Sequence, residues 1–321
     1  MRSKTYLQMF FYILGFIFIF SILYAYYFSR NYPLPLTSRV SLDAKIKFIR
    51  ENINLNDIDT LVVGSSMALN NVRGAELEVS SKVCKGVLNI STYAANPGKV
   101  AQTLELIELF PNLERIIYSV QYFDFHGVSK FREYDVDMIK KYIGNTLSME
   151  ERFKVFFNAT KNIPFLMFRH FEWETLHAQS NKFTYLGFDK TGSSPLQMYG
   201  DDILPNRWKY SSWFPHHTKK PYKVLGKILR EAHKNELKFY FIQQPYRTGL
   251  IKKHPNLNTE INWFLNKTEK IVESNNGIFL SLQKSLPLSN KYYADRAHLN
   301  AEGSTLSTKA IAKFIDKVEK K

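Results

Sequence analysis

Short apolar runs alternate with amphipathic helical patterns along most of the chain. Each run ends at Gly, Pro or a polar residue, which is typical of a buried strand. Strands that alternate with helices predict an α/β fold, in which helices cover both faces of a parallel sheet. The predicted strands are 58–63, 86–90, 115–120, 237–243 and 277–282. The predicted helices include 37–52, 100–110 and 301–318, the last with Asn300 as its N-cap.

The alternation breaks at about 125–220, where aromatic residues are frequent and loop-like segments occur. We interpret this stretch as an insertion of helices and long loops over the strand ends. Its expected role is a lid that shapes a substrate groove, and the alternative is extra core packing.

The longest apolar run lies at the N-terminus, where residues 5–29 contain no charged side chain. About 20 apolar residues suffice to cross a bilayer, so this run predicts one transmembrane helix. Arg2 and Lys4 precede it and favour a cytoplasmic N-terminus. The run is longer than the apolar part of a cleaved signal peptide, so an uncleaved anchor is preferred. The expected organisation is an anchor and Pro-containing linker at 1–36, then one extracytoplasmic domain at 37–321.

The amino-acid composition limits which partners and cofactors are expected for that domain. Hydrophobic residues make up 45% of the 321 residues, which is enough for a sizeable core. The net charge of +15 is spread along the chain without a dense basic tract, so nucleic acid is not an expected partner. Cys84 is the single cysteine, which excludes an internal disulfide and a zinc–thiolate cluster, and it is expected to be a small buried residue. No metal-binding or nucleotide-binding motif is found, so no cofactor and no metal are expected.

Two short blocks carry candidate chemistry. Gly64-Ser65-Ser66 directly follows the first predicted strand, and the carboxyl ends of parallel strands are where ligands bind. Asp295 and His298 stand three residues apart just before the last helix, which places them on one side of a helical turn. A serine needs a base to remove its proton and a third group to orient that base. Each residue also has an ordinary structural explanation, since Ser caps helices and Asp forms turns.

On these residues the chain resembles an SGNH (GDSL-type) hydrolase, in particular the membrane-anchored cell-envelope branch that includes lipoteichoic-acid D-alanylation and alginate O-acetylation proteins. Gly64-Ser65-Ser66 matches the first family block with Ser in place of Asp, and Asp295-Arg296-Ala297-His298 matches the last. The resemblance implies a flavodoxin-like three-layer sandwich and a triad of Ser66, His298 and Asp295, with Ser65 the less favoured nucleophile.

The middle blocks of the family, which supply the oxyanion hole, match less well. The second block is expected to provide Gly98, or Ala94 through its backbone N–H. Gln121 stands at the end of the third strand, where the family has an Asn, and is expected to act as the amide donor.

The resulting expectation is a membrane-anchored serine acyltransferase or esterase. The resemblance implies O-acyl, chiefly O-acetyl, groups of a cell-surface polysaccharide or polymer as substrate, and a multi-spanning membrane acyltransferase as partner. The alternative is an inactive binding or assembly module with the same fold, and a further alternative is an anchored thioesterase or lipase.

Overall fold

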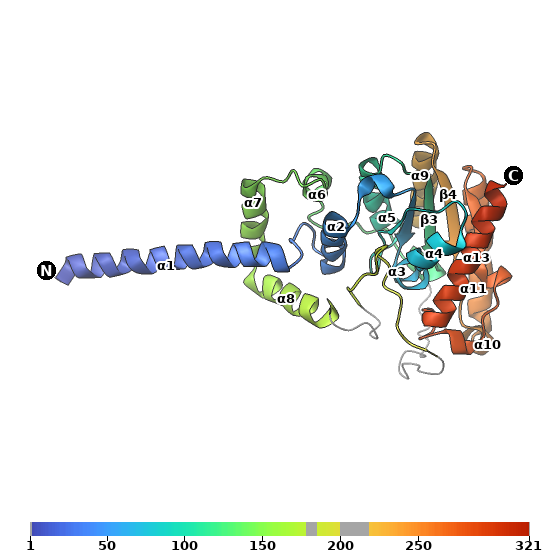
Figure 1. Cartoon of the computed structure of the whole chain (residues 1–321). Coiled ribbons are helices and arrows are strands. Elements are labelled where there is room, and N and C mark those ends of the chain that lie inside the picture. Colours follow the sequence, from blue (N-terminus) through green and yellow to red (C-terminus); the bar gives the residue numbers. More distant parts are fainter. Residues whose placement is uncertain (1, 178–184, 200–217, 321) are drawn as a thin grey trace.

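The computed structural model describes residues 2–177, 185–199 and 218–320 of the chain. Its centre is a five-stranded, fully parallel sheet with the strand order β2-β1-β3-β4-β5, the flavodoxin-like order (Figure 1). The predicted α/β sandwich is therefore confirmed. The strands are β1 Thr60–Gly64, β2 Val87–Asn89, β3 Arg115–Val120, β4 Lys238–Gln243 and β5 Ile278–Ser281.

Helices cover both faces of this sheet. The α-helices are α1 Arg2–Asn31, α2 Val40–Asn52, α3 Ser66–Asn71, α4 Gly74–Ser80, α5 Pro97–Thr103, α6 Val136–Ile143, α7 Met149–Thr160, α8 Ile163–His177, α9 Lys219–Lys234, α10 Thr248–Lys253, α11 Pro255–Glu273, α12 Leu282–Ser285 and α13 Ala301–Glu319. Short 3₁₀ helices are η1 Leu55–Asp57, η2 Leu104–Leu109, η3 Tyr122–Phe125 and η5 Asn290–Tyr292.

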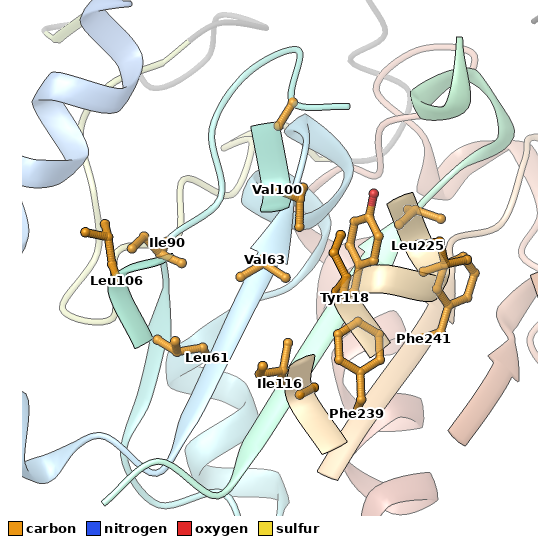
Figure 2. Packing of buried hydrophobic residues seen from close by; sticks show 14 of the residues in the cluster. Leu61, Val63, Ile90, Val100, Leu106, Ile116, Tyr118, Leu225, Phe239 and Phe241 are labelled. Carbon is orange, nitrogen blue, oxygen red and sulfur yellow. The ribbon is translucent and has the colours of Figure 1, made fainter. Parts of the chain in front are cut away.

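Alternate residues of each strand enter two separate cores, because successive side chains point to opposite faces of a sheet. Leu61 and Val63 of β1 join Tyr118, Phe239 and other residues in the larger core, which α5, α9 and α11 cover (Figure 2). The residues between them, such as Val62, pack in a smaller core against α4 and α13. Burial on both faces explains why the strands read as continuous apolar runs.

The helix predicted at 100–110 differs from the structure. Asn96 caps a helix that begins at Pro97, and its side chain accepts hydrogen bonds from the next N–H groups. The chain then tightens at Leu104 into the 3₁₀ helix η2. The other two predicted helices correspond to α2 and α13, and Asn300 caps α13 as expected.

The insertion does not lie over the strand ends as one unit. Helices α7 and α8 lie beside α1 and α2, away from the sheet (Figure 1). Thr191 instead lies at the outer edge of β2, where Asn89 N–H donates to Thr191 O at 2.8 Å. This contact covers a sheet edge that would otherwise expose its backbone groups. The segment that contains Thr191 then passes to α3 and to the start of α13, where Ala301 N–H donates to Met198 O at 2.9 Å. The parts of the insertion at 178–184 and 200–217 lie outside the described residues.

The N-terminal helix α1 projects away from the body of the molecule (Figure 1). Its stretch Lys4–Tyr24 has a mean hydropathy of 2.1 and is not buried, so it is long and apolar enough to cross a membrane. The predicted linker that follows is not a free tether, because Leu34 and Leu36 are buried in the larger core.

A partly buried ionic cluster closes the amino-terminal end of the sheet. Glu319 at the end of α13 accepts hydrogen bonds from Arg115 at 2.7 and 3.0 Å, from Lys238 at 2.7 Å and from Tyr240 at 2.7 Å. Burial raises the pKa of Glu319, but these donors outweigh it and bring its pKa from 4.5 to about 2.

We expect Glu319 to stabilise the fold in a pH-dependent way. A depressed carboxyl pKa contributes stability above pH 4.5, and this stability is lost as the pH falls toward 2. In Glu319→Gln the free energy of unfolding should therefore be lower than in wild type at pH 7, and the difference should shrink steadily below pH 4.5. Urea titrations in detergent at several pH values measure it, and a difference that does not change with pH would contradict the role.

Candidate active site

The turn between β1 and α3 separates the roles of the two adjacent serines. Gly64 adopts a φ of 147°, and a Cβ there would lie 2.4 Å from Ser119 O, so glycine is required. Ser65 is the N-cap of α3 and accepts a hydrogen bond from Met67 N–H at 3.1 Å. Ser66 opens the helix, is half-buried, and keeps its hydroxyl available for another partner. The capping role therefore falls to Ser65.

That partner is the predicted histidine. His298 Nε2 lies 2.8 Å from Ser66 Oγ, and His298 Nδ1 lies 2.8 Å from Asp295 Oδ2. Both distances fall within the reach expected of a nucleophile–base–carboxylate arrangement. Since the carboxylate accepts the Nδ1 proton, Nε2 is left to accept the proton of Ser66.

Asp295 is held rigidly in the charged form. Its other oxygen, Oδ1, accepts the backbone N–H groups of Ala297 and His298, each at 2.7 Å. Burial raises the pKa of Asp295, but His298 and these hydrogen bonds outweigh it, so the pKa lies below its ordinary value. The carboxylate is thus ionised at neutral pH and able to orient the imidazole.

The segment that carries Asp295 and His298 is a loop and not the predicted helical turn. A backbone bridge pairs Tyr293 with Leu299, and Ala294 N–H donates to His298 O at 2.9 Å. The hydrogen bonds of Asp295 and this backbone pairing together place the two side chains next to each other. Helix α13 begins only after it, at Ala301.

Asn71 is a site residue that the sequence did not reveal. It lies on α3, the same helix as Ser66, and its Oδ1 accepts Leu299 N–H at 3.0 Å. Its Nδ2 donates to Ala297 O at 3.5 Å. These bonds join the helix of the serine to the loop of the histidine, and no spacing in the sequence indicates a contact between residues so far apart.

The two predicted oxyanion donors are already occupied. Gln121 Nε2 donates to Pro245 O at 2.9 Å and to Ala297 O at 3.4 Å. Gly98 N–H donates to Asn96 Oδ1 at 3.1 Å as part of the α5 cap. Each donor would have to give up its hydrogen bond before it could meet a developing oxyanion, so their role stays a prediction.

Two backbone groups are available to donate. Within the described residues, the N–H groups of Ser66 and Ala94 have no hydrogen-bond acceptor. Ala94 has a φ of 54°, and Thr92 N–H donates to Gly64 O at 3.2 Å, which holds this loop beside the end of β1. Ala94 and Gly98 were the two expected backbone donors of the oxyanion hole. Ala94 is favoured because its N–H has no acceptor, whereas the N–H of Gly98 has one.

A second carboxylate, that of Asp124, lies beside the turn between β1 and α3. Asp124 Oδ2 accepts Gln121 N–H at 2.8 Å, and its carboxylate lies near the Ser65 hydroxyl. Burial raises the pKa of Asp124 to about 7, although the Gln121 N–H and the Ser65 hydroxyl act against the rise. Asp124 thus links the end of β3 to the serine turn. No pattern in the sequence indicates this contact.

No metal site accompanies these groups in the described part of the chain. No group of three or more His, Cys, Asp or Glu residues there converges as metal ligands would. Cys84 is fully buried, and burial raises the pKa of its thiol, as expected of a packing residue. A cavity of about 680 Å³ lies at the opposite end of the sheet, lined by residues such as Leu113 and Leu237, and it does not include Ser66.

We expect Gln121→Ala to lower the free energy of unfolding by about 1–3 kcal/mol, because the buried carbonyl oxygens of Pro245 and Ala297 lose a donor. Urea unfolding in detergent measures the change. Gln102→Ala is the matched control, since Gln102 is a buried glutamine that bonds to Phe131 N–H away from the site. A loss below about 0.5 kcal/mol for Gln121→Ala would mean that the amide is available as a donor to substrate.

Comparison with known proteins does not assign the chain to a family. No family model and no curated protein matches the sequence. The resemblance to SGNH hydrolases therefore rests on the two blocks around Ser66 and His298. The chemistry of the site is argued from the geometry of Ser66, His298 and Asp295.

Proposed function

We propose that this protein is a membrane-anchored serine acyltransferase or esterase. The observation that carries the proposal is the continuous hydrogen-bonded chain from Ser66 Oγ through His298 to Asp295, with both links at 2.8 Å. Ser66 is the nucleophile, His298 the general base and then acid, and Asp295 the group that orients the imidazole.

The reaction follows from this order of groups. Ser66 Oγ attacks an ester carbonyl carbon while His298 Nε2 takes its proton, and the carbonyl oxygen becomes an oxyanion. The N–H groups of Ser66 and Ala94 are the donors proposed for it. The ester bond then breaks, His298 returns the proton to the leaving alcohol, and an acyl-Ser66 remains. In the second half the oxygen of an acceptor hydroxyl or of water attacks the acyl carbon while His298 takes its proton. The bond between the acyl carbon and Ser66 Oγ then breaks, and His298 returns the proton to Ser66 Oγ.

The substrate class and location belong to the same proposal. The resemblance to envelope proteins supports O-acetyl or similar groups on a cell-surface polysaccharide or polymer, with a multi-spanning membrane acyltransferase as acyl donor. The exposed apolar helix α1 supports an anchor with the sheet domain on the extracytoplasmic side. Arg2 and Lys4 at the N-terminal end of α1 agree with that orientation.

A non-catalytic assembly module is the second candidate. It is favoured by the occupied amide of Gln121 and the occupied N–H of Gly98, because a site without oxyanion donors turns over slowly. The two candidates differ in whether Ser66 reacts with an electrophile.

A fluorophosphonate probe separates them, because it reacts only with an activated serine. We expect labelling of the wild type, complete loss in Ser66→Ala, and retention in Ser65→Ala. The last variant loses the cap on Met67 N–H, at a cost of about 1 kcal/mol, but keeps the triad. Labelling is read by gel fluorescence on detergent-solubilised protein. Folded wild-type protein that takes up no probe would favour the assembly module.

Asp295→Asn tests the orienting carboxylate. The asparagine oxygen can still accept the N–H groups of Ala297 and His298, but its NH₂ group faces Nδ1 and favours the wrong imidazole tautomer. We expect the rate of p-nitrophenyl acetate cleavage to fall about 10³- to 10⁴-fold. Thermal unfolding of the same preparation controls for folding. An unchanged rate would remove Asp295 from the mechanism.

A further inference from the structure

The insertion helices α7 and α8 expose an unusual amount of apolar surface. On α8, Met167 is 67% and Phe171 69% exposed, and Ile163 and Phe168 are similarly open. Phe157 at the end of α7 is also exposed. An apolar face of this kind on a water-facing helix indicates a surface that something covers.

The exposed face of α8 points away from the domain. Arg169, on the other side of the helix, is buried and pairs with Asp43 of α2, and its Nη1 donates to Thr37 O at 3.2 Å. At 100° per residue, Met167 and Phe171 lie about 160° around the helix from Arg169. Since Arg169 faces the body, these two side chains face away from it.

Helix α7 contacts the anchor within its apolar stretch. Phe153 and Phe157 line a groove of about 400 Å³ together with Leu14, Ile17 and Phe18 of α1. Nearer the domain, the rings of Phe156 and Tyr24 lie with centroids 6.0 Å apart. The stretch Lys4–Tyr24 has 21 residues and therefore spans about 30 Å, the thickness of a hydrocarbon core.

A side chain that touches the middle of α1 lies within any bilayer that α1 crosses. We infer that α7 and α8 are seated in the same membrane as α1, with Phe157, Ile163, Met167, Phe168 and Phe171 among the lipid acyl chains. The occupant of the apolar face is lipid because Phe157 of α7 lies against the apolar stretch of α1. Helix α8 continues from there to Tyr32, just beyond this stretch, where the boundary of a bilayer would lie. Amphipathic helices of this kind lie in the interface with their apolar side about 5–10 Å deep.

This inference rests on the proposed anchoring by α1 and goes beyond it. A lone anchor leaves the domain free to rotate and tilt above the membrane. A second contact through α7 and α8 fixes its orientation, because α8 is joined to the domain by the buried Asp43–Arg169 pair. The membrane contact is then a surface of the domain itself and not only its tether.

Depth-dependent quenching on the full-length chain tests the inference. Met167→Cys and Phe171→Cys are labelled with an environment-sensitive NBD fluorophore and reconstituted into phosphatidylcholine–phosphatidylglycerol liposomes. Native Cys84 is fully buried, so unsubstituted protein gives the labelling background. Val79→Cys is the matched control, since Val79 is an apolar residue, 81% exposed, on α4 of the domain.

We expect NBD at 167 and 171 to be quenched by lipids with a doxyl group at acyl carbon 5 and to be shielded at least several-fold from iodide relative to NBD at 79. Iodide quenching at 167 and 171 equal to that at 79 would overturn the inference. Shielding from iodide without doxyl quenching would also overturn it, because a second copy of the chain would then cover the face.

Membrane anchoring by α1 and the reactivity of Ser66 are measured separately in the same sample. Flotation of the liposomes reports on α1, and fluorophosphonate labelling reports on Ser66. Protein that floats but gives no lipid quenching at 167 and 171 overturns the seating of α7 and α8 alone. Protein that does not float overturns both the anchor and the seating, whatever the labelling shows.

Discussion

The candidate site depends on how the loop of Asp295 and His298 is fastened to the sheet. The carbonyl oxygen of Ala297, between the two residues, accepts hydrogen bonds from Asn71 of α3 and from Gln121 at the end of β3. A buried acceptor left without a donor costs about 1–3 kcal/mol, so the loop is stable mainly where both amides reach it. The same position brings His298 to Ser66. The fold thus sets the Ser66–His298 distance through a backbone atom and not through the histidine alone.

Buried amides and hydroxyls extend this fastening across the carboxyl end of the sheet. Gln244 Nε2 donates to Ser119 Oγ of β3 at 2.9 Å, and its Oε1 accepts the hydroxyl of Ser307 of α13 at 3.1 Å. Asp124 connects the start of η3 to Ser65. A network whose members are satisfied selects one arrangement of the elements it joins. At the opposite end of the sheet, the ionic cluster of Glu319, Arg115 and Lys238 joins α13 to β3 and β4.

The sequence predicted the features that depend on a local pattern of residues. Continuous apolar runs identified all five strands, since both faces of each strand are buried, and the spacing of Asp295 and His298 identified one half of the site. It could not tell which serine caps α3, because Ser65 and Ser66 have the same local preference. The direction of the Gln121 amide, the contact of Asn71 with Leu299 and the position of α8 depend on residues more than 100 positions away. The periodicity of a sequence does not show such contacts. They determine which groups are free to act as oxyanion donors and where the insertion helices lie.

Helix α2 joins the insertion helices to the edge of the sheet through two buried ionisable side chains. Asp43 holds Arg169 of α8, and Lys45 donates to Asn89 O at the end of β2 and to Gly192 O of the edge segment. Burial lowers the pKa of Lys45 well below its ordinary value, so the position is costly for stability alone. A buried pair tolerates little displacement, because separation leaves a charge without a partner. The hairpin of α7 and α8 is therefore rigidly oriented relative to the sheet, and a membrane that receives the hairpin also orients Ser66.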